Sequence, residues 1–381
     1  MENQALSIAF DAKRITHNRT GLGNYGRTLV NNLATYYPNN KYLLYTPDEG
    51  KKLLRKQIVS CQQIEFRYSD SNVRISKAWW RSFGIVKDLK QSPPSLYHGL
   101  SAELPFGLRK AGIKSVLTVH DLIFIRHPEY YNKIDRMIYT FKYKMACQQA
   151  DHIIAISEMT KRDIISYFHV PEKKIDVIYQ GCDESFKKEA TQFDKIRVKK
   201  QYQLPDCYIL YVGSMEERKN LMLIVKAIKQ MKNPIYLVAV GKRTPYADKV
   251  EDYVRENSLK PYVSILNEVP FMDLPALYQQ AALFIYPSRI EGFGIPIIEA
   301  IHSKVPVIAT IGSCLEEAGG PNSLYVSPDN AMELAETIER IVTDKTLRKK
   351  MVEVGKEYVS QFESQILTQK LMNIYKKVLV E

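Results

Sequence analysis

Residues 281–299 read Ala-Ala-Leu-Phe-Ile-Tyr-Pro-Ser-Arg-Ile-Glu-Gly-Phe-Gly-Ile-Pro-Ile-Ile-Glu, and the rest of the chain is organised around this stretch. The apolar run at its start predicts a buried strand. Gly292 and Gly294 then form a loop with little steric cover, so that backbone N–H groups can approach a ligand closely. Pro296 suits the first turn of a helix, where a missing N–H costs nothing. The stretch therefore predicts a strand, a glycine turn and a helix N-terminus.

Two carboxylates accompany this turn, Glu291 on the loop and Glu299 on the helix. A helix N-terminus presents free N–H groups and the positive end of the helix dipole, and both suit a phosphate. An ionised carboxylate only accepts hydrogen bonds, so two of them suit hydroxyl groups. Phosphate and hydroxyl groups together describe a sugar nucleotide. The alternative is an ordinary turn with two solvated glutamates, because a glutamate pair at this spacing is common by chance.

Strands and helices alternate along both halves of the chain. In the first half we expect strands at residues 6–11, 42–45, 95–98, 115–119 and 152–156, and in the second half at 208–212, 235–240, 263–266, 283–286, 305–310 and 324–326. Two such halves without a long repeat predict an α/β protein with two doubly wound, Rossmann-like domains. Residues 187–200 are charged and lack a strand pattern, so we interpret them as the linker and the entry to the second domain. The domains are then residues 1–186 and 187–362, followed by an amphipathic helix at 363–381.

Positive charge is concentrated in one part of the chain. The net charge is +12, and residues 51–150 contain 18 Lys and Arg against 7 Asp and Glu. Such an excess favours an anionic partner, such as a membrane surface, a phosphorylated lipid or nucleic acid, although charge also serves solubility alone. Residues 75–89 predict a helix that mixes tryptophans with basic residues, which can dock at a membrane interface or use its tryptophans as core. We expect peripheral membrane contact through the segment Lys77 to Lys90, and no nucleic acid partner.

The composition favours a cytoplasmic protein. No run of about 18 apolar residues could span a membrane, and the start of the chain lacks the features of a signal peptide. The five cysteines are scattered without a C-x-x-C pair, which disfavours both a disulfide framework and a metal cluster. We therefore expect reduced thiols, and a location in the cytoplasm or at the inner face of the membrane.

Residues 21–26 read Gly-Leu-Gly-Asn-Tyr-Gly and open a predicted helix. The spacing matches G-x-G-x-x-G, and Asp48 follows the next strand, as in a dinucleotide-binding fingerprint. In that fingerprint the first glycine ends the first strand directly, whereas here about ten residues separate Phe10 from Gly21. An NAD-dependent oxidoreductase that uses this loop is the alternative from another functional class. A non-catalytic protein that binds nucleic acid or membrane through its basic region is a further one.

Polar residues follow two other strands, at the edge where open α/β sheets bind ligands. His120 and Asp121 end one strand, and a histidine there can donate to a sugar hydroxyl or to a reacting oxygen. Arg218 and Lys219 lie just beyond another strand, where positive charge suits a diphosphate leaving group. A capping His-Asp pair and a charged helix start are the plainer interpretations.

In combination, these motifs resemble the signature of the retaining, nucleotide-sugar-dependent glycosyltransferases of family 4, which have the GT-B fold. The resemblance rests on Gly-x-Gly, Val-His-Asp-Leu, Gly-x4-Arg-Lys-Asn and Pro-Ser-x-x-Glu-Gly-Phe-Gly-x-Pro-x-x-Glu, which occur in the right order and in the right halves. Residues 20–33 and 115–163 look most like mannosyltransferases of bacterial polysaccharide synthesis. Many family members carry a further arginine directly after the glycine of the third motif, where this chain has Ser214.

The resemblance implies two Rossmann-like domains that face a central cleft, with the last helix crossing back to the first domain. It implies that the first domain binds a glycan or lipid-linked acceptor and that the second binds a nucleoside-diphosphate sugar. It also implies transfer of a hexose with retention at the anomeric carbon, in cell-surface polysaccharide synthesis, without a catalytic metal or another cofactor.

The resemblance also implies which residues bind the donor. They are Gly21, Gly23, Arg218, Lys219, Val269, Phe293, Gly294, Ile295 and Glu299. Arg218, Lys219 and the N–H groups of residues 293–295 would bind the diphosphate. Glu299 would accept hydrogen bonds from the ribose hydroxyls, and Val269 would pack near the base.

Two residues are expected to take part in catalysis. His120 would donate a hydrogen bond to the transferred sugar near the reacting face, and Glu291 would accept from one of the sugar's hydroxyls. The acceptor would lie past the glycine loop at residues 21–26. The leaving phosphate would deprotonate the acceptor, and no side chain is assigned as nucleophile.

Overall fold

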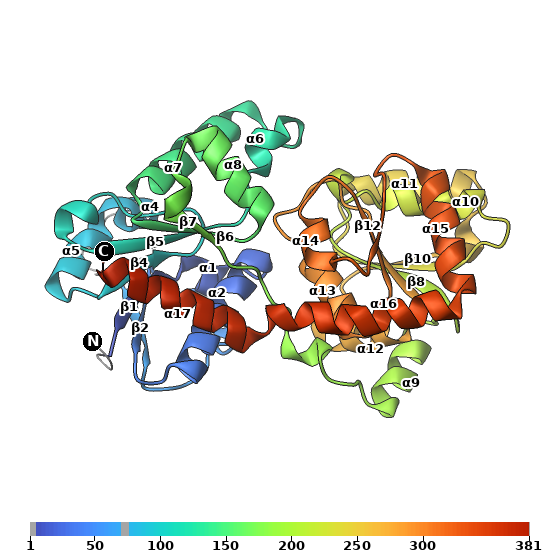
Figure 1. Cartoon of the computed structure of the whole chain (residues 1–381), viewed down its shortest axis with the longest axis horizontal. Helices are drawn as coiled ribbons and strands as arrows, with labels where there is room; N and C mark the ends of the chain where they lie inside the picture. The colour runs from blue at the N-terminus through green and yellow to red at the C-terminus, as the bar shows by residue number, and fades with distance from the viewer. Residues whose placement is uncertain (1–4, 70–75, 381) are drawn as a thin grey trace. The chain divides into compact units, whose positions relative to one another are not determined.

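The structure is a computed structural model of the chain and describes residues 5–69 and 76–380. These residues divide into two compact units (Figure 1). The first contains the residues up to Gln180 and those from Glu363 onward, and the second contains Gly181 to Phe362. Each is built around a parallel sheet, which confirms the expected pair of doubly wound, Rossmann-like units. Within the described ranges, no helix has both the length and the apolar character needed to cross a membrane.

The described residues of the first unit form a seven-stranded parallel sheet in the order β3-β2-β1-β4-β5-β6-β7. The strands are β1 (Ser7–Asp11), β2 (Lys41–Thr46), β3 (Ile64–Tyr68), β4 (Leu96–Gly99), β5 (Lys114–Val119), β6 (His152–Ala155) and β7 (Ile175–Val177). The helices are α1 (Lys13–His17), α2 (Gly21–Tyr36), α3 (Lys52–Arg55), α4 (Lys77–Trp79), α5 (Ile85–Gln91), α6 (Ile123–Arg126), α7 (Lys133–Gln149), α8 (Glu158–Phe168) and α17 (Ser364–Val380), with short turns η1 (Trp80–Gly84), η2 (Arg109–Ala111), η3 (Pro128–Tyr130) and η4 (Glu172–Lys174). Ile8 and Phe10 pack with residues of α2 and α17, whereas Ala9 packs with residues of η1 and α5. Because successive side chains of a strand point to opposite faces, this sheet has a core on each side.

The described residues of the second unit form a six-stranded parallel sheet in the order β10-β9-β8-β11-β12-β13. The strands are β8 (Tyr208–Val212), β9 (Tyr236–Val240), β10 (Val263–Leu266), β11 (Leu283–Tyr286), β12 (Val307–Thr310) and β13 (Leu324–Val326). The helices are α9 (Gln192–Gln201), α10 (Leu221–Gln230), α11 (Pro245–Glu256), α12 (Leu274–Gln280), α13 (Ile295–His302), α14 (Leu315–Gly319), α15 (Ala331–Thr343) and α16 (Lys345–Tyr358), with short turns η5 (Glu184–Phe186), η6 (Glu217–Lys219), η7 (Lys260–Tyr262), η8 (Phe271–Asp273) and η9 (Val359–Phe362). The expected strand, turn and helix at residues 281–299 are therefore confirmed as β11, a loop and α13.

The last helix, α17, belongs to the first unit. Tyr375 on this helix is fully buried, and its hydroxyl lies 2.6 Å from Nδ1 of His98 in β4. Nε2 of His98 lies 2.8 Å from the hydroxyl of Thr118 in β5. Desolvation lowers the pKa of His98 to about 3, so this buried imidazole is neutral. A polar chain inside the apolar core thus joins the end of the sequence to the middle of the first sheet.

The boundary between the units differs from the expected position after residue 186. Residues 181–186 belong to the second unit. The fully buried ring of Phe186 explains this, because it packs edge-on against Phe271 and Tyr278 with ring centroids 5.7 and 5.5 Å apart. Much of the expected linker is also ordered as α9, whose first turn is capped by the side chain of Thr191.

Two details of the first unit also differ from the expectation. The segment of about ten residues between β1 and the glycine helix contains the short helix α1, which was not predicted from the sequence. Residues 64–68 form the edge strand β3, which the sequence pattern did not reveal because polar and charged side chains interrupt its apolar ones.

The helix expected at residues 75–89 starts at Ile75, which lies outside the described residues. From residue 77 it continues through α4, the π-helical segment η1 and α5. Trp80 is buried in the core, whereas Trp79 is 49% exposed. Arg81 forms ion pairs with Asp11 and Glu103, and its side chain is only 12% exposed. Arg81 is therefore not one of the free cations that the expected membrane contact would use.

Candidate active site

The second sheet brings together the expected donor-binding residues that follow β8 and β11, whereas Gly21 and Gly23, also expected to bind the donor, lie in the first unit. Its strand order reverses between β8 and β11, which pair with each other. In open α/β sheets, ligands bind at such a reversal, beyond the carboxyl ends of the strands. Arg218 and Lys219 follow β8 in η6, and Glu291 follows β11. The topology thus places two cations and a carboxylate side by side, although many residues separate them in the sequence.

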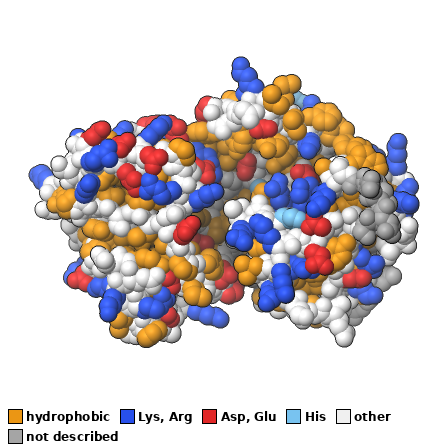
Figure 2. Space-filling model, turned by 180° about the vertical axis from the view of Figure 1, so that it is seen from behind, with side chains coloured by type: hydrophobic (Ala, Val, Ile, Leu, Met, Phe, Trp, Pro, Cys, Tyr) orange, Lys and Arg blue, Asp and Glu red, His pale blue; other side chains and the backbone are white. Residues whose placement is uncertain are grey.

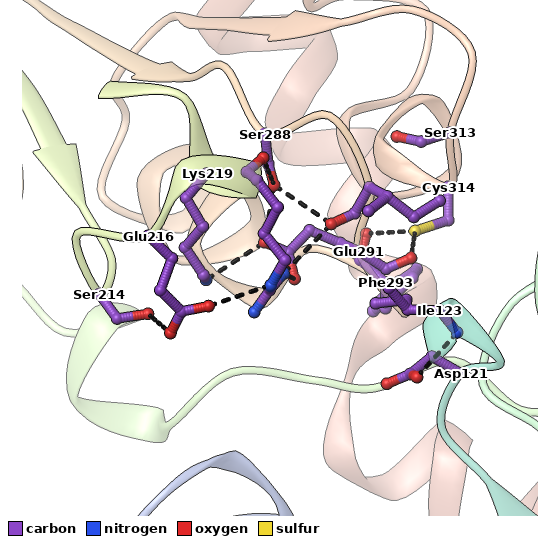
Figure 3. A network of polar contacts seen from close by, with 12 residues as sticks. Asp121, Ile123, Ser214, Glu216, Lys219, Ser288, Glu291, Phe293, Ser313 and Cys314 are labelled. Carbon is purple, nitrogen blue, oxygen red and sulfur yellow. Dashed lines mark hydrogen bonds and ion pairs between the residues drawn. The ribbon is translucent and has the colours of Figure 1, made fainter. Parts of the chain in front are cut away.

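Glu291 accepts from cations and hydroxyl groups at once (Figure 3). Its Oε2 lies 3.1 Å from Nη1 of Arg218, and its Oε1 lies 3.2 Å from Nζ of Lys219. The hydroxyl groups of Tyr286 and Ser288 donate to Oε1 over 3.0 and 2.9 Å. Burial alone would raise the pKa of Glu291, but the charges of Lys219 and Arg218 outweigh it and lower this pKa to about 2. The carboxylate therefore stays ionised at neutral pH and holds both cations beyond the sheet.

Arg218 is fixed by further contacts. Nε of Arg218 donates to Oε2 of Glu216 over 3.0 Å, and the hydroxyl of Ser214 donates to Oε1 of the same glutamate over 2.6 Å. Nη1 of Arg218 donates to the carbonyl of Ile290 over 3.2 Å. Ser214, at the position where the resemblance leads us to expect arginine, thus supports Arg218 through Glu216. Figure 3 shows this chain of contacts from Ser214 through Glu216 to the group around Glu291.

The glycine turn is shaped by backbone conformation and by close packing. Gly294 has a φ of +130°, which L side chains rarely adopt. A Cβ at this position would lie 3.0 Å from Cδ2 of Leu315 and 3.2 Å from Cβ of Ala318, so α14 packs directly against the turn. Helix α13 begins at Ile295, with Pro296 in its first turn. The first N–H groups of a helix have no acceptor within it, so this N-terminus suits an anion.

Phe293 anchors the turn instead of lining it. Its side chain is 2% exposed, and its ring packs against Phe362 with ring centroids 5.5 Å apart. The thiol of Cys314 donates to the carbonyl of Phe293 over 3.2 Å and to that of Glu291 over 3.0 Å. Because the side chain of Phe293 is buried, only the backbone of this residue is available to a ligand.

Glu299 has a different environment from Glu291. It lies on α13, where the hydroxyl of Tyr278 donates to its Oε2 over 2.9 Å. Desolvation raises the pKa of Glu299 to about 7, the charge of Asp183 adds to this, and the hydrogen bond from Tyr278 opposes it. Val269, the residue expected near the base, is half-buried in the loop after β10, at the carboxyl edge of the same sheet.

His120 follows β5 in the first unit, and its ring is held by other residues of that unit. Its Nε2 lies 2.8 Å from the carbonyl oxygen of Leu100, which can only accept, so Nε2 carries the proton. Nδ1 then accepts from the amide of Gln180 over 3.2 Å, and the ring of Tyr25 packs edge-on with ring centroids 4.7 Å apart. Desolvation lowers the pKa of His120 to about 4, so the imidazole is neutral. To donate a hydrogen bond to a sugar hydroxyl, Nε2 of His120 must give up its contact with the carbonyl oxygen of Leu100.

Comparison with known proteins agrees with this geometry. The family model for Glycosyltransferase Family 4 matches residues 20–186, and that for Glycosyl transferases group 1 matches residues 192–358. O-antigen chain mannosyltransferase B of Escherichia coli is 30% identical, over 97% of this chain and 100% of its own length. The chain is a family 4 glycosyltransferase. The capsular polysaccharide biosynthesis glycosyltransferase CapM of Staphylococcus aureus is 28% identical, over 87% of this chain and 92% of its own.

Solved glycosyltransferases share the fold. A glycosyltransferase from Rickettsia africae has a TM-score of 0.80 and is 20% identical, with 99% of each chain covered. An Anabaena protein solved with UDP and glucose has a TM-score of 0.77 and is 17% identical, with 98% of this chain and 100% of that chain covered. The GT-B architecture expected from the sequence is therefore confirmed, and the family models and the relatives above confirm the enzyme class.

Because the chain is a glycosyltransferase, the alternative of an NAD-dependent oxidoreductase is wrong. The glycines at residues 21–26 then need another explanation, and packing supplies one for two of them. A Cβ at Gly23 would lie 2.0 Å from the carbonyl oxygen of Asn18, and one at Gly26 would also meet a residue of α1. These two glycines thus let the start of α2 pack closely against the preceding segment. A Cβ at Gly21 would meet nothing within 4 Å, so this glycine alone of the three borders open space. Asp48, the residue that completed the apparent fingerprint, pairs with a lysine of α4 at 2.5 Å.

Sequence reasoning missed a polar cavity in the first unit of the glycosyltransferase. Arg81 lines it together with Asp11 and Glu103, and the Arg81–Glu103 ion pair measures 2.5 Å. Asp11 is the last residue of β1, and the first sheet reverses its strand order between β1 and β4. The cavity thus lies at the ligand-binding edge of that sheet. The available signal was an acidic residue at the end of the first strand.

Proposed function

We propose that this glycosyltransferase moves mannose from a nucleoside-diphosphate sugar to a glycan or lipid-linked acceptor during cell-surface polysaccharide synthesis, and that it retains the anomeric configuration. The names of the relatives support the sugar and the process, because one is an O-antigen chain mannosyltransferase and another is a capsular polysaccharide enzyme. The observation that carries the proposal is the pair of cations held by ionised Glu291 beside the N-terminus of α13.

In this proposal the second unit binds the donor. Arg218 and Lys219 contact the diphosphate, and the N–H groups at residues 293–295 complete its site. Glu299 accepts hydrogen bonds from the ribose hydroxyls, for which it must be ionised. Val269 packs near the base. Glu291 holds both cations in place, so little reorganisation is needed when negative charge develops on the leaving group.

The transfer breaks the bond from the anomeric carbon to the donor phosphate and forms a bond from that carbon to the acceptor oxygen on the same face. The acceptor proton passes to the leaving phosphate. Glu291 accepts from a sugar hydroxyl, and His120 donates to the sugar. The low pKa of Glu291 and its two cationic partners make it a weak base and a weak nucleophile, which favours a step without a covalent enzyme intermediate. The step as proposed involves no metal and no further cofactor.

In this proposal the acceptor binds to the first unit, beside Gly21 at the start of α2. Open space around Gly21 is consistent with this role, whereas the packing of Gly23 gives that residue a structural reason to be glycine. We place the protein in the cytoplasm, at the inner face of the membrane when the acceptor is lipid-linked.

A thermal-shift panel of GDP, UDP, ADP and NAD tests the donor site on the wild type and on Glu299→Ala. We expect one nucleoside diphosphate to raise Tm, and the variant to lose most of that shift. Stabilisation by NAD alone would move the site to the first unit. The mannose conjugate of the stabilising nucleotide can then be incubated with enzyme alone and followed by NMR. Release of the anomer opposite to that of the donor would overturn retention.

A further inference from the structure

Helix α7 (Lys133–Gln149) exposes a stripe of large apolar side chains. Ile134, Met137, Ile138 and Phe141 are 72, 71, 45 and 63% exposed. Their spacing of three, four and seven residues places them on one face of the helix. Such a stripe normally marks the buried face of a helix, and here it faces solvent. We call these four residues the α7 stripe.

The opposite face of α7 is the one that packs. The rings of Tyr139 and Tyr143 lie against Phe124, with ring centroids 5.8 and 4.9 Å apart. Ala146 and Cys147 are the fully buried residues of this helix. Each tyrosine is two positions from Phe141, which is about half a turn around the helix. The helix therefore contacts its unit mainly through Tyr143 and its last turn, since Tyr139 is still 41% exposed, and the α7 stripe is a separate apolar face that remains exposed.

Lysines flank the α7 stripe. Lys133, Lys142 and Lys144 are all exposed and lie to either side of it. They belong to the region that carries most of the excess positive charge of the chain. A partner that covers the α7 stripe must therefore place negative charge beside these lysines. Protein interfaces are depleted in lysine, whereas lysines beside an exposed apolar stripe are typical of helices that lie at an anionic membrane surface.

A second exposed patch continues the same surface. Trp79 and Phe83 are 49 and 48% exposed, and Phe83 stacks on Phe106 with ring centroids 4.9 Å apart. Phe106 lines the polar cavity at Asp11 together with Met145. Met145 lies four residues after Phe141 and so on the same face of α7 as the stripe. Aromatic and apolar side chains from two segments of the first unit thus border one cavity.

We propose that the α7 stripe docks the protein on an anionic lipid surface, with its apolar side chains in the interfacial layer and its lysines at the headgroups. Figure 2 shows a band of hydrophobic side chains along the upper edge of the first unit, where Figure 1 draws α7. The docking surface is thus centred on α7, and the exposed Trp79 and Phe83 of the segment Lys77 to Lys90 border it. Docking is independent of the donor and acceptor assignments above.

Co-sedimentation with vesicles tests the apolar part of this surface. The full-length protein is mixed with vesicles of phosphatidylcholine, either alone or with about one third phosphatidylglycerol. We expect Met137→Gln/Phe141→Gln to bind the anionic vesicles at least about tenfold more weakly than the wild type, since each buried methylene contributes to insertion. Phe193→Gln/Ile196→Gln on α9 is the matched control, because these residues are 75 and 64% exposed at the same kind of spacing. Equal binding by the wild type and the α7 variant would overturn the proposal.

The lysines are tested separately. We expect Lys133→Gln/Lys144→Gln to lose about fivefold per lysine on the anionic vesicles, and to lose nothing on phosphatidylcholine alone. Lys349→Gln/Lys350→Gln on α16 is the control for net charge. Equal losses in both pairs would show nonspecific attraction and overturn the assignment to α7.

A second copy of the chain is the competing occupant of the stripe. Sedimentation velocity without lipid decides this, because a wild-type dimer that becomes a monomer in Met137→Gln/Phe141→Gln would overturn membrane docking. The nucleotide-induced Tm shift is measured on every variant. If this shift stays at the wild-type value while vesicle binding falls, the docking surface is separated from the donor site and from any loss of folding.

Discussion

Binding of the donor nucleotide should depend on pH through Glu299. Its pKa is raised to about 7 in the free protein, so about half of the molecules carry a protonated Glu299 at neutral pH. A protonated carboxyl cannot accept hydrogen bonds at both oxygens from two ribose hydroxyls as a carboxylate can. Binding must therefore either select the ionised form or drive the proton off.

The size of the effect follows from that pKa. Because the apparent affinity falls with the fraction of competent protein, the nucleotide should bind about tenfold more weakly at pH 6 than at pH 8. This corresponds to about 1.4 kcal/mol. An ordinary glutamate is already ionised at pH 6 and would give no such change. Calorimetry in two buffers of different ionisation enthalpy should also find about half a proton released per nucleotide at pH 7.

Glu299→Gln is the matched control, because it keeps the shape of the side chain and cannot titrate. The terminal phosphate of a nucleoside diphosphate itself titrates near pH 6, so the comparison between the wild type and Glu299→Gln isolates the contribution of the protein. The intact nucleotide sugar, whose phosphate does not titrate there, gives a second check. If the wild type and the variant show the same dependence on pH, the reasoning about Glu299 is wrong.

Three further perturbations test other parts of the structure. Lys219→Ala should lower turnover by about 100-fold or more, because a cation at the leaving diphosphate is lost, whereas Lys226→Ala on the exposed side of α10 should leave steady-state rates unchanged. Gly294→Ala should reduce the free energy of unfolding by about 1–3 kcal/mol in urea titrations, because it forces a side chain into a φ of +130°. Tyr375→Phe should cost about 1–3 kcal/mol in the same assay, because it leaves Nδ1 of buried His98 without its partner. An unchanged unfolding midpoint for Tyr375→Phe would show that this buried hydrogen bond contributes nothing.

Much of the fold was readable from the sequence because local and global signals agree. The run Leu283 to Tyr286 is apolar throughout and is a fully buried strand, and Pro296 lies in the first turn of α13 as its chemistry predicts. The edge strand β3 was missed because an edge strand is half solvated, so its sequence lacks the apolar run that marks a central strand. Periodicity reports burial, and it fails where an element is exposed.

The residues of the candidate site could be proposed from the sequence, but their contacts with each other could not. The sequence suggested that Arg218 and Lys219 meet a phosphate and that Glu291 meets a sugar. Their pairing with each other depends on β8 and β11 being neighbours in the sheet, which is a property of topology. The same limit applies to α7, whose periodic apolar residues predict a helix without showing which face the sheet will cover.

The two glutamates of the central stretch differ because of what each one faces. Glu291 lies on the loop beside the cations of η6, which keep it ionised, whereas Glu299 lies within α13 opposite Tyr278, where desolvation dominates. Between pH 5 and 9, Glu299 is thus the member of the pair that changes charge. Because kcat/KM reports the free enzyme, its pH profile should show one acidic limb near pH 7, and this limb should vanish in Glu299→Gln. A further limb that disappears in Glu291→Gln would mean that the cations do not hold Glu291 ionised, and the geometry of the cluster would then need a different explanation. In the proposed site, the two carboxylates therefore have different roles because of their environments: Glu291 is a permanent charge that orders the cations, and Glu299 is a titrating group that we expect to couple donor binding to pH.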